Sequence, residues 1–434
     1  MAPWLDRTLV QYYCNSWVFG VHPGANYPKY VASFPPNSFP PNCLASFPIW
    51  GYSILLRLLE SVTAVVVLQS FLGALATASL MVRLNALLPE TSRLTTALFL
   101  TSFPWLSWMA CAYQLPMSAA FMILTLLALE MAIRTGRITW GITAGVLGAV
   151  GQNFRSELLL LPGTILVVVL TLRKLKWLRC PSIKPLAVGV GVALALQMPW
   201  ALNCYFNAGR FSLSESNLGH VIFRGLGKLP RNPWGITDSD GFAQETVKKA
   251  GLDCGSLSFE GGDFLKREFL ANVKQDPVFY AKAIAARFWK TIYLPFGFNR
   301  MYVTPTEKTK AHELVWQKVP VETFSYCMAT EHVEQSGAVS NVKVAGLIFY
   351  SLSQCLLICA VSILGIIGFF LSMRTGPFRL NEPLILCLGV ALLYRCSLNV
   401  ALFDAGGYMI SVYLCYLPFV INSLCKVSRK RLWR

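Results

Sequence analysis

The chain has 434 residues, of which 55% are hydrophobic and 14% are charged, and its formal net charge is +17. Soluble globular domains carry about a quarter charged residues, so this composition excludes a soluble enzyme and indicates a membrane protein. The positive charge does not indicate nucleic-acid binding, because the basic excess lies in short segments between apolar runs, as in the cytoplasmic loops of membrane proteins.

Apolar runs along the chain predict an all-α polytopic membrane protein with about nine transmembrane helices. A bilayer core about 30 Å thick needs roughly 20 apolar residues per helix. The expected spans, in chain order, are 54–84, 94–112, 115–133, 138–153, 157–172, 185–202, 344–373, 383–400 and 407–425. The pair at 138–153 and 157–172 could also form one irregular unit, so the count holds to within about one.

Lysine and arginine in the short loops predict the orientation of these spans. Basic residues gather in the turns at 83–93, 134–137, 173–184 and 374–379, and again in the C-terminal tail. The turns between them, at 112–115 and 403–407, carry almost none. Since cytoplasmic loops carry the excess of basic residues, the basic turns and the C-terminus are expected inside.

This orientation divides the chain into five parts. They are an extracytoplasmic first loop at 1–53, transmembrane helices at 54–204, an extracytoplasmic loop domain at 205–341, transmembrane helices at 342–425 and a basic cytoplasmic tail at 426–434. No apolar run precedes the first loop, so we expect either that it crosses the membrane as a short tail or that an upstream helix is missing.

The loop domain has mixed charge and two amphipathic segments, at 266–273 and 276–293, that predict helices. The second segment carries aromatic residues beside Lys282, Arg287 and Lys290, a combination typical of a helix at the membrane interface. The alternative is that this helix packs on the rest of the loop domain, and the sequence favours neither.

Charged residues within apolar spans are costly and indicate functional sites unless they pair locally. Seven qualify: Arg57, Glu60, Glu130, Arg155, Glu157, Arg395 and Asp404. Helical spacing predicts local ion pairs for Arg57 with Glu60 and for Glu130 with Arg134. Arg395 and Asp404 either pair with each other or face a cavity.

Arg155 and Glu157 lie at the outer junction of two expected spans. An arginine in such a place can bind a phosphate through two parallel hydrogen bonds. Arg155 is therefore the leading candidate for a phosphate-binding residue.

The sequence predicts no cofactor. Asp238-Ser239-Asp240 has the Asp-x-Asp spacing of the metal motif in sugar-nucleotide enzymes, but such short matches arise by chance and no neighbouring residue completes a site. A divalent metal is compatible with the sequence without being indicated by it.

Several segments, taken in order, resemble the GT-C glycosyltransferases that use polyprenyl-phosphate sugars, in particular the protein O-mannosyltransferase and lipid A aminoarabinose transferase group. The segments are Ser46–Tyr52, Asn153–Leu159, Trp200–Asn203 with Gly209–Ser216, Asp276–Tyr280 and Gly407–Pro418. Two departures are the lack of a first helix ahead of the first loop, and Gly407 where the family has an arginine before the tyrosine, here Tyr408.

The resemblance implies a GT-C-like helical bundle that transfers a sugar from a polyprenyl-phosphate donor to a lipid, glycan or protein acceptor at the outer face. It implies a catalytic acid in the first external loop, where Asp6 is the only acidic residue before Glu60. Arg155 would bind the donor phosphate, with Glu157 and Tyr408 in support. The expected surroundings are membrane lipids in the bacterial inner membrane, with the endoplasmic reticulum as the alternative, and no nucleic acid.

Two other functions fit the same composition. A transporter or flippase for a lipid-linked glycan would also be polytopic, although such proteins often contain inverted repeats and none is visible here. A non-catalytic homologue that serves as an assembly subunit is the second alternative.

Overall fold

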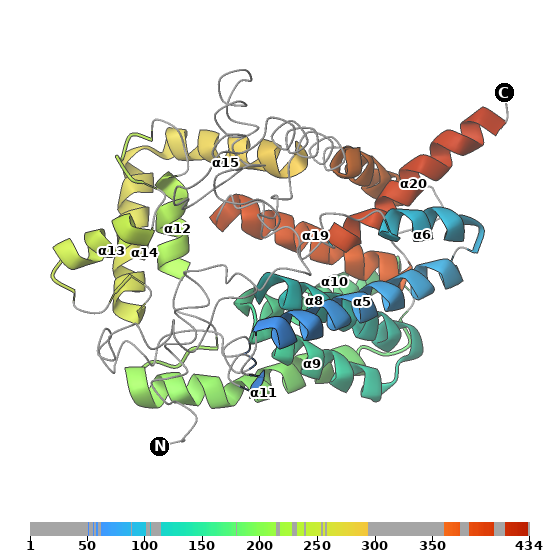
Figure 1. Cartoon of the computed structure of the whole chain (residues 1–434), viewed down its shortest axis with the longest axis horizontal. Helices are drawn as coiled ribbons and strands as arrows, with labels where there is room; N and C mark the ends of the chain where they lie inside the picture. The colour runs from blue at the N-terminus through green and yellow to red at the C-terminus, as the bar shows by residue number, and fades with distance from the viewer. Residues whose placement is uncertain are drawn as a thin grey trace.

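The part of the chain that the structure describes is helical throughout its regular elements and contains no strand. This computed structural model describes residues 62–87, 89–100, 114–178, 180–213, 218–227, 232–237, 240–252, 255–256, 258–293, 360–373, 382–402 and 413–432, with the single positions 51, 55, 58, 59 and 105. Figure 1 shows a bundle of apolar helices on one side and a smaller group, α12 to α15, on the other. The predicted all-α class is therefore confirmed for the described residues.

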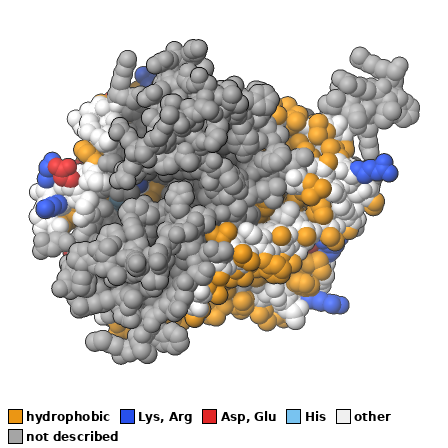
Figure 2. Space-filling model, in the orientation of Figure 1, with side chains coloured by type: hydrophobic (Ala, Val, Ile, Leu, Met, Phe, Trp, Pro, Cys, Tyr) orange, Lys and Arg blue, Asp and Glu red, His pale blue; other side chains and the backbone are white. Residues whose placement is uncertain are grey.

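Three helices are long and apolar enough to cross a membrane. They are α5 (Val62–Leu87), α8 (Gln114–Thr135) and α11 (Lys184–Ala208), with apolar stretches at Ala64–Leu87, Pro116–Thr135 and Lys184–Phe206. In α8, 78% of the apolar window is buried, against 28% in α5, so α8 is the central helix and α5 lies at the outside. Figure 2 shows hydrophobic side chains gathered on the described part of the bundle's visible face, as expected for a surface that faces lipid.

The other helices of the bundle overlap the remaining predicted spans. They are α6 (Ser92–Leu100), α9 (Ile138–Gln152), α10 (Leu160–Lys174), the helix Ala360–Met373, α19 (Pro383–Leu402) and α20 (Tyr413–Leu432), with one-turn 3₁₀ helices η1 (Pro89–Thr91) and η2 (Ser156–Leu159). Segments α9 and α10 are two helices and not one irregular unit. Each has 15 residues and is about 22 Å long at 1.5 Å per residue, so the count of nine spans stays a prediction.

Helix α9 packs against α11 at a crossing lined by glycines. A Cβ atom placed on Gly141 would lie 2.0 Å from the carbonyl oxygen of Pro185, and one placed on Gly145 would lie 2.4 Å from that of Gly189. Small residues that allow two backbones to approach this closely are the usual device of helix packing in membranes.

The crossing yields a stability prediction for Gly141→Ala. The added methyl group meets backbone rather than a flexible side chain, so α9 and α11 must separate, and overpacking of this kind costs about 1–3 kcal/mol. Gly191→Ala in α11 is the matched control, because a Cβ there meets nothing within 4 Å. We expect the unfolding temperature of the detergent-purified protein to fall for the first variant only; an equal fall in both would contradict the close crossing.

The loop domain contains four helices around a small apolar core. They are α12 (Leu218–Gly227), α13 (Asp240–Lys249), α14 (Phe259–Gln275) and α15 (Pro277–Tyr293). Buried side chains shared among them include Phe223, Leu226, Ala243, Val247 and Leu265. The helix predicted at 266–273 starts earlier, at Phe259, because Ser258 caps it by accepting a hydrogen bond from the Gly261 N–H.

Helix α15 packs on the loop domain and against α19 of the bundle, and part of its surface is exposed. Phe279 meets Trp234 edge to face at 5.3 Å between ring centroids, and the buried Arg287 donates a 2.6 Å hydrogen bond to the Gly225 carbonyl oxygen. Val278 and Phe288 remain more than half exposed. Packing on the loop domain, one of the two predicted alternatives, is therefore present, and an apolar surface is left beside it.

Candidate functional site

The candidate site is the turn that follows α9 and contains Arg155. The helix closes with hydrogen bonds from the Phe154 and Arg155 N–H groups to the Gly151 carbonyl oxygen, at 3.0 Å each. The backbone of Arg155 is then extended, with φ −157° and ψ 126°, before η2 begins at Ser156. Arg155 is half-buried at this break between two apolar helices.

Its neighbours hold this turn in place. The buried ring of Phe154 stacks on Phe121 of α8 at 5.6 Å between centroids. The side chain of Gln152 accepts a 3.0 Å hydrogen bond from the Leu159 N–H, which ties the end of α9 to the end of η2. Since both sides of Arg155 are fixed in this way, its position is set by the fold rather than by a bound ligand.

Two other segments of the chain meet the same turn. The Gly51 N–H donates a 2.8 Å hydrogen bond to the Asn153 carbonyl oxygen, and the Gln152 side chain donates a 3.4 Å hydrogen bond to the Leu213 carbonyl oxygen. A Cβ on Gly51 would lie 2.7 Å from that oxygen of Asn153, so this approach requires glycine. Positions about 100 residues before and 60 residues after the turn thus contact the two residues at the end of α9 that precede Phe154 and Arg155.

The remaining predicted site residues are placed only in part. Position 157 lies in η2, two residues after Arg155. Asp6 and Tyr408 lie outside the described residues, as do Arg57, Glu60 and Asp404 among the charged residues singled out above. The structure therefore brings Arg155 and Glu157 into one turn and leaves the other site assignments as predictions.

Metal-binding groups are not found in the described part of the chain, where no cluster of three or more His, Cys, Asp and Glu side chains occurs. Of the Asp238-Ser239-Asp240 motif, only position 240 is described, as the first residue of α13.

An ion pair connects the segment after α11 to the loop domain. Helix α11 ends at Ala208 and is capped by Gly209, whose left-handed φ of 65° suits glycine. Arg210 then forms an ion pair with Asp263 of α14, which Lys266 also approaches at 3.3 Å. Partial burial acts to raise the pKa of Asp263, but the pairs with Arg210 and Lys266 outweigh burial and hold that pKa below its usual value.

The opposite end of the bundle carries an ion-pair network around Glu130. This carboxylate is fully buried and accepts hydrogen bonds from Arg83, at 2.7 and 3.2 Å, and from Arg134, at 2.7 Å. Arg134 also pairs with Glu382, just before α19. The predicted pair between Glu130 and Arg134 is confirmed, whereas the sequence did not indicate the two further partners, Arg83 of α5 and Glu382.

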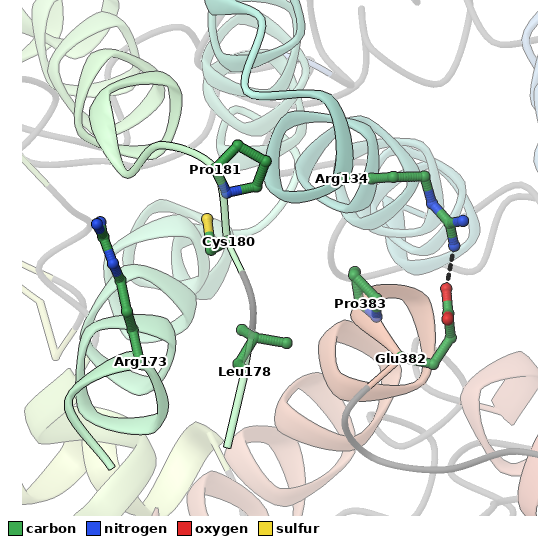
Figure 3. Close-up of a pocket in the computed structure, with 7 residues that line it drawn as sticks. All are labelled: Arg134, Arg173, Leu178, Cys180, Pro181, Glu382 and Pro383. Atoms are coloured by element: carbon green, nitrogen blue, oxygen red, sulfur yellow. Dashed lines mark hydrogen bonds and ion pairs between the residues drawn. The ribbon is translucent and has the colours of Figure 1, made fainter. Parts of the chain in front are cut away.

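A pocket of about 500 Å³ lies beside this network. Figure 3 shows Arg173 of α10 on one side and the paired Arg134 and Glu382 on the other, with Cys180 and Pro181 between them. Burial raises the pKa of the Glu382 carboxyl above its usual range, although the positive charge of Arg134 acts in the opposite direction. Because α9 runs about 22 Å from this end to the Arg155 turn, the pocket and the candidate site are separate.

Comparison with protein-family models, with curated proteins and with solved structures finds no match to the chain.

Proposed function

We propose that the chain is a multi-pass membrane glycosyltransferase with a GT-C-like bundle of about nine spans, acting at the outer face of the bacterial inner membrane. In this proposal it moves a sugar from a polyprenyl-phosphate donor to a lipid, glycan or protein acceptor. The three apolar helices that can cross a membrane support the membrane location.

One observation carries the proposal. The segments that hold Gly51, Arg155 and Leu213 each belong to a part of the chain that resembles the GT-C enzymes, and they meet at the end of α9. Hydropathy alone does not require this meeting, because these segments are far apart in the sequence. Their convergence around a basic residue is what a site for a lipid-linked phosphate needs.

In the proposed reaction, Asp6 acts as the general base and Arg155 stabilises the leaving group. The carboxylate of Asp6 takes the proton of the acceptor hydroxyl, whose oxygen attacks C1 of the sugar. The bond between C1 and the phosphate oxygen breaks, and its electron pair leaves with the polyprenyl phosphate. Arg155 stabilises the charge that develops on this leaving group, and such preorganised electrostatic stabilisation is usually the largest single contribution to catalysis.

The test is transfer of radiolabelled sugar from a polyprenyl phosphate into membrane acceptors by the full chain. Incorporation of label is the expected result. A transporter would move the intact lipid-linked sugar across vesicles without forming product, and a non-catalytic homologue would do neither. Either of these two results would overturn the proposal.

The role of Asp6 gives a separate prediction. Asp6→Asn keeps the size of the side chain but removes the basic carboxylate, so transfer should fall by at least about 100-fold while membrane insertion stays unchanged. Initial rates of transfer, compared at equal amounts of inserted protein, check this. Retained activity would end the assignment of Asp6 and leave the transferase itself in place.

A further inference from the structure

The pocket beside Arg134 has more positive than negative charge on its walls and rim. Glu130 and Glu382 are matched by Arg83 and Arg134, which pair with them. Arg173 lines the other side, and within the described part of the chain no carboxylate pairs with it. An anion is therefore the complementary ligand.

The pocket also lies at the ends of several helices, and the ends of a membrane-spanning helix are the parts that meet the headgroup region. It is formed where α8 and α10 end and where α11 and α19 begin, and α8 and α11 both hold apolar stretches long enough to span. The basic turns at this end are those predicted to face the cytoplasm. On the predicted orientation, the pocket lies at the level of the cytoplasmic leaflet.

Apolar surface adjoins the basic side of the pocket. After Arg173 and Lys174, the chain exposes Leu175 and Trp177, at 55% and 70% of their surface, before Leu178 returns to line the pocket. Exposed tryptophan beside basic residues is typical of the membrane–water interface. A free phosphate ion would use only the arginine, whereas a lipid would also use this apolar surface.

We propose that this pocket binds the headgroup phosphate of an anionic glycerophospholipid in the cytoplasmic leaflet. Arg173 contacts the phosphate, and Leu175 and Trp177 contact the lipid at the level of the headgroup and the first methylenes. Basic pockets between membrane helices on the cytoplasmic side are suited to such headgroups. This inference does not depend on glycosyl transfer, since the pocket and the Arg155 turn are at opposite ends of α9.

The experiment measures apparent Kd values by native mass spectrometry of the full chain in a neutral detergent. The probes are dioctanoyl phosphatidylglycerol, dioctanoyl phosphatidylcholine and inorganic phosphate. Arg173→Gln should weaken phosphatidylglycerol binding by about tenfold, the value of one charge-assisted contact. Lys174→Gln, which removes the same charge from the next residue outside the pocket lining, should weaken it by less than about threefold.

Arg173→Lys provides a second variant with the charge retained and the planar guanidinium lost. We expect an affinity between those of the original protein and Arg173→Gln, because lysine binds phosphate as a point charge. Equal losses of phosphatidylglycerol affinity in Arg173→Gln and Lys174→Gln would show that general surface charge attracts the lipid, and would overturn the proposal. Equal affinity for phosphatidylcholine, or for inorganic phosphate, would overturn the anionic-lipid assignment.

Discussion

Replacing Glu130 with Gln is expected to lower the free energy of unfolding by about 3 kcal/mol, the lower end of the cost of breaking a buried ion pair. The carboxylate is fully buried and is shared by Arg83 and Arg134, so its loss leaves two guanidinium groups without their common partner. The lower end applies because these arginine side chains keep 27% and 36% of their surface exposed. The measurement is the unfolding temperature of the detergent-purified protein, which should fall by several degrees.

The matched control for this variant is Glu245→Gln in α13. Glu245 pairs with Lys249 at the same spacing of four residues, but the two side chains are 60% and 74% exposed. Exposed pairs of this kind contribute little to stability, so the control should leave the unfolding temperature unchanged. An unfolding temperature that is unchanged for Glu130→Gln as well would show that the network does not support the bundle.

Replacing Arg155 with Ala should reduce transfer of sugar about 100-fold, the effect of removing one preorganised group from a developing negative charge. The fold should persist, because Phe154 and Gln152 hold the turn, and alanine keeps the backbone hydrogen bond from position 155 to the Gly151 carbonyl oxygen. The measurement is kcat and kcat/KM for transfer from a polyprenyl-phosphate sugar, together with the unfolding temperature. A lost phosphate contact lowers both kinetic constants while the unfolding temperature stays the same.

Two further variants separate a specific contact from general charge. Arg155→Lys should recover part of the lost activity, because it restores the charge without the bidentate guanidinium. Arg137→Ala removes an exposed arginine just before α9, at the opposite end of the same helix, and should leave transfer within about twofold. If Arg155→Ala retains full activity, the donor phosphate lies elsewhere.

Local features of the sequence predicted the positions of the apolar helices. Each of α5, α8 and α11 lies within or extends a predicted span, because a run of apolar residues forms a helix wherever it must satisfy its backbone without water. The pair between Glu130 and Arg134 was predictable for a similar reason, since four residues make one turn of a helix. Helices α12 and α13 were not predicted, because they have only ten residues each and lie in a segment of mixed polarity.

By itself the sequence determined that the protein is helical, apolar and basic at its turns, and it singled out Arg155 as a charge between two apolar helices. Only the tertiary structure decided which distant residues share a site: Gly51 beside Asn153, Arg83 and Glu382 around the pair of Glu130 and Arg134, and Arg173 across a pocket from them. The physical reason is that hydropathy and helical spacing depend on near neighbours in the chain. Contacts between helices depend on how closely their backbones can approach, which at Gly141 and Gly145 is set by the absence of a single carbon atom.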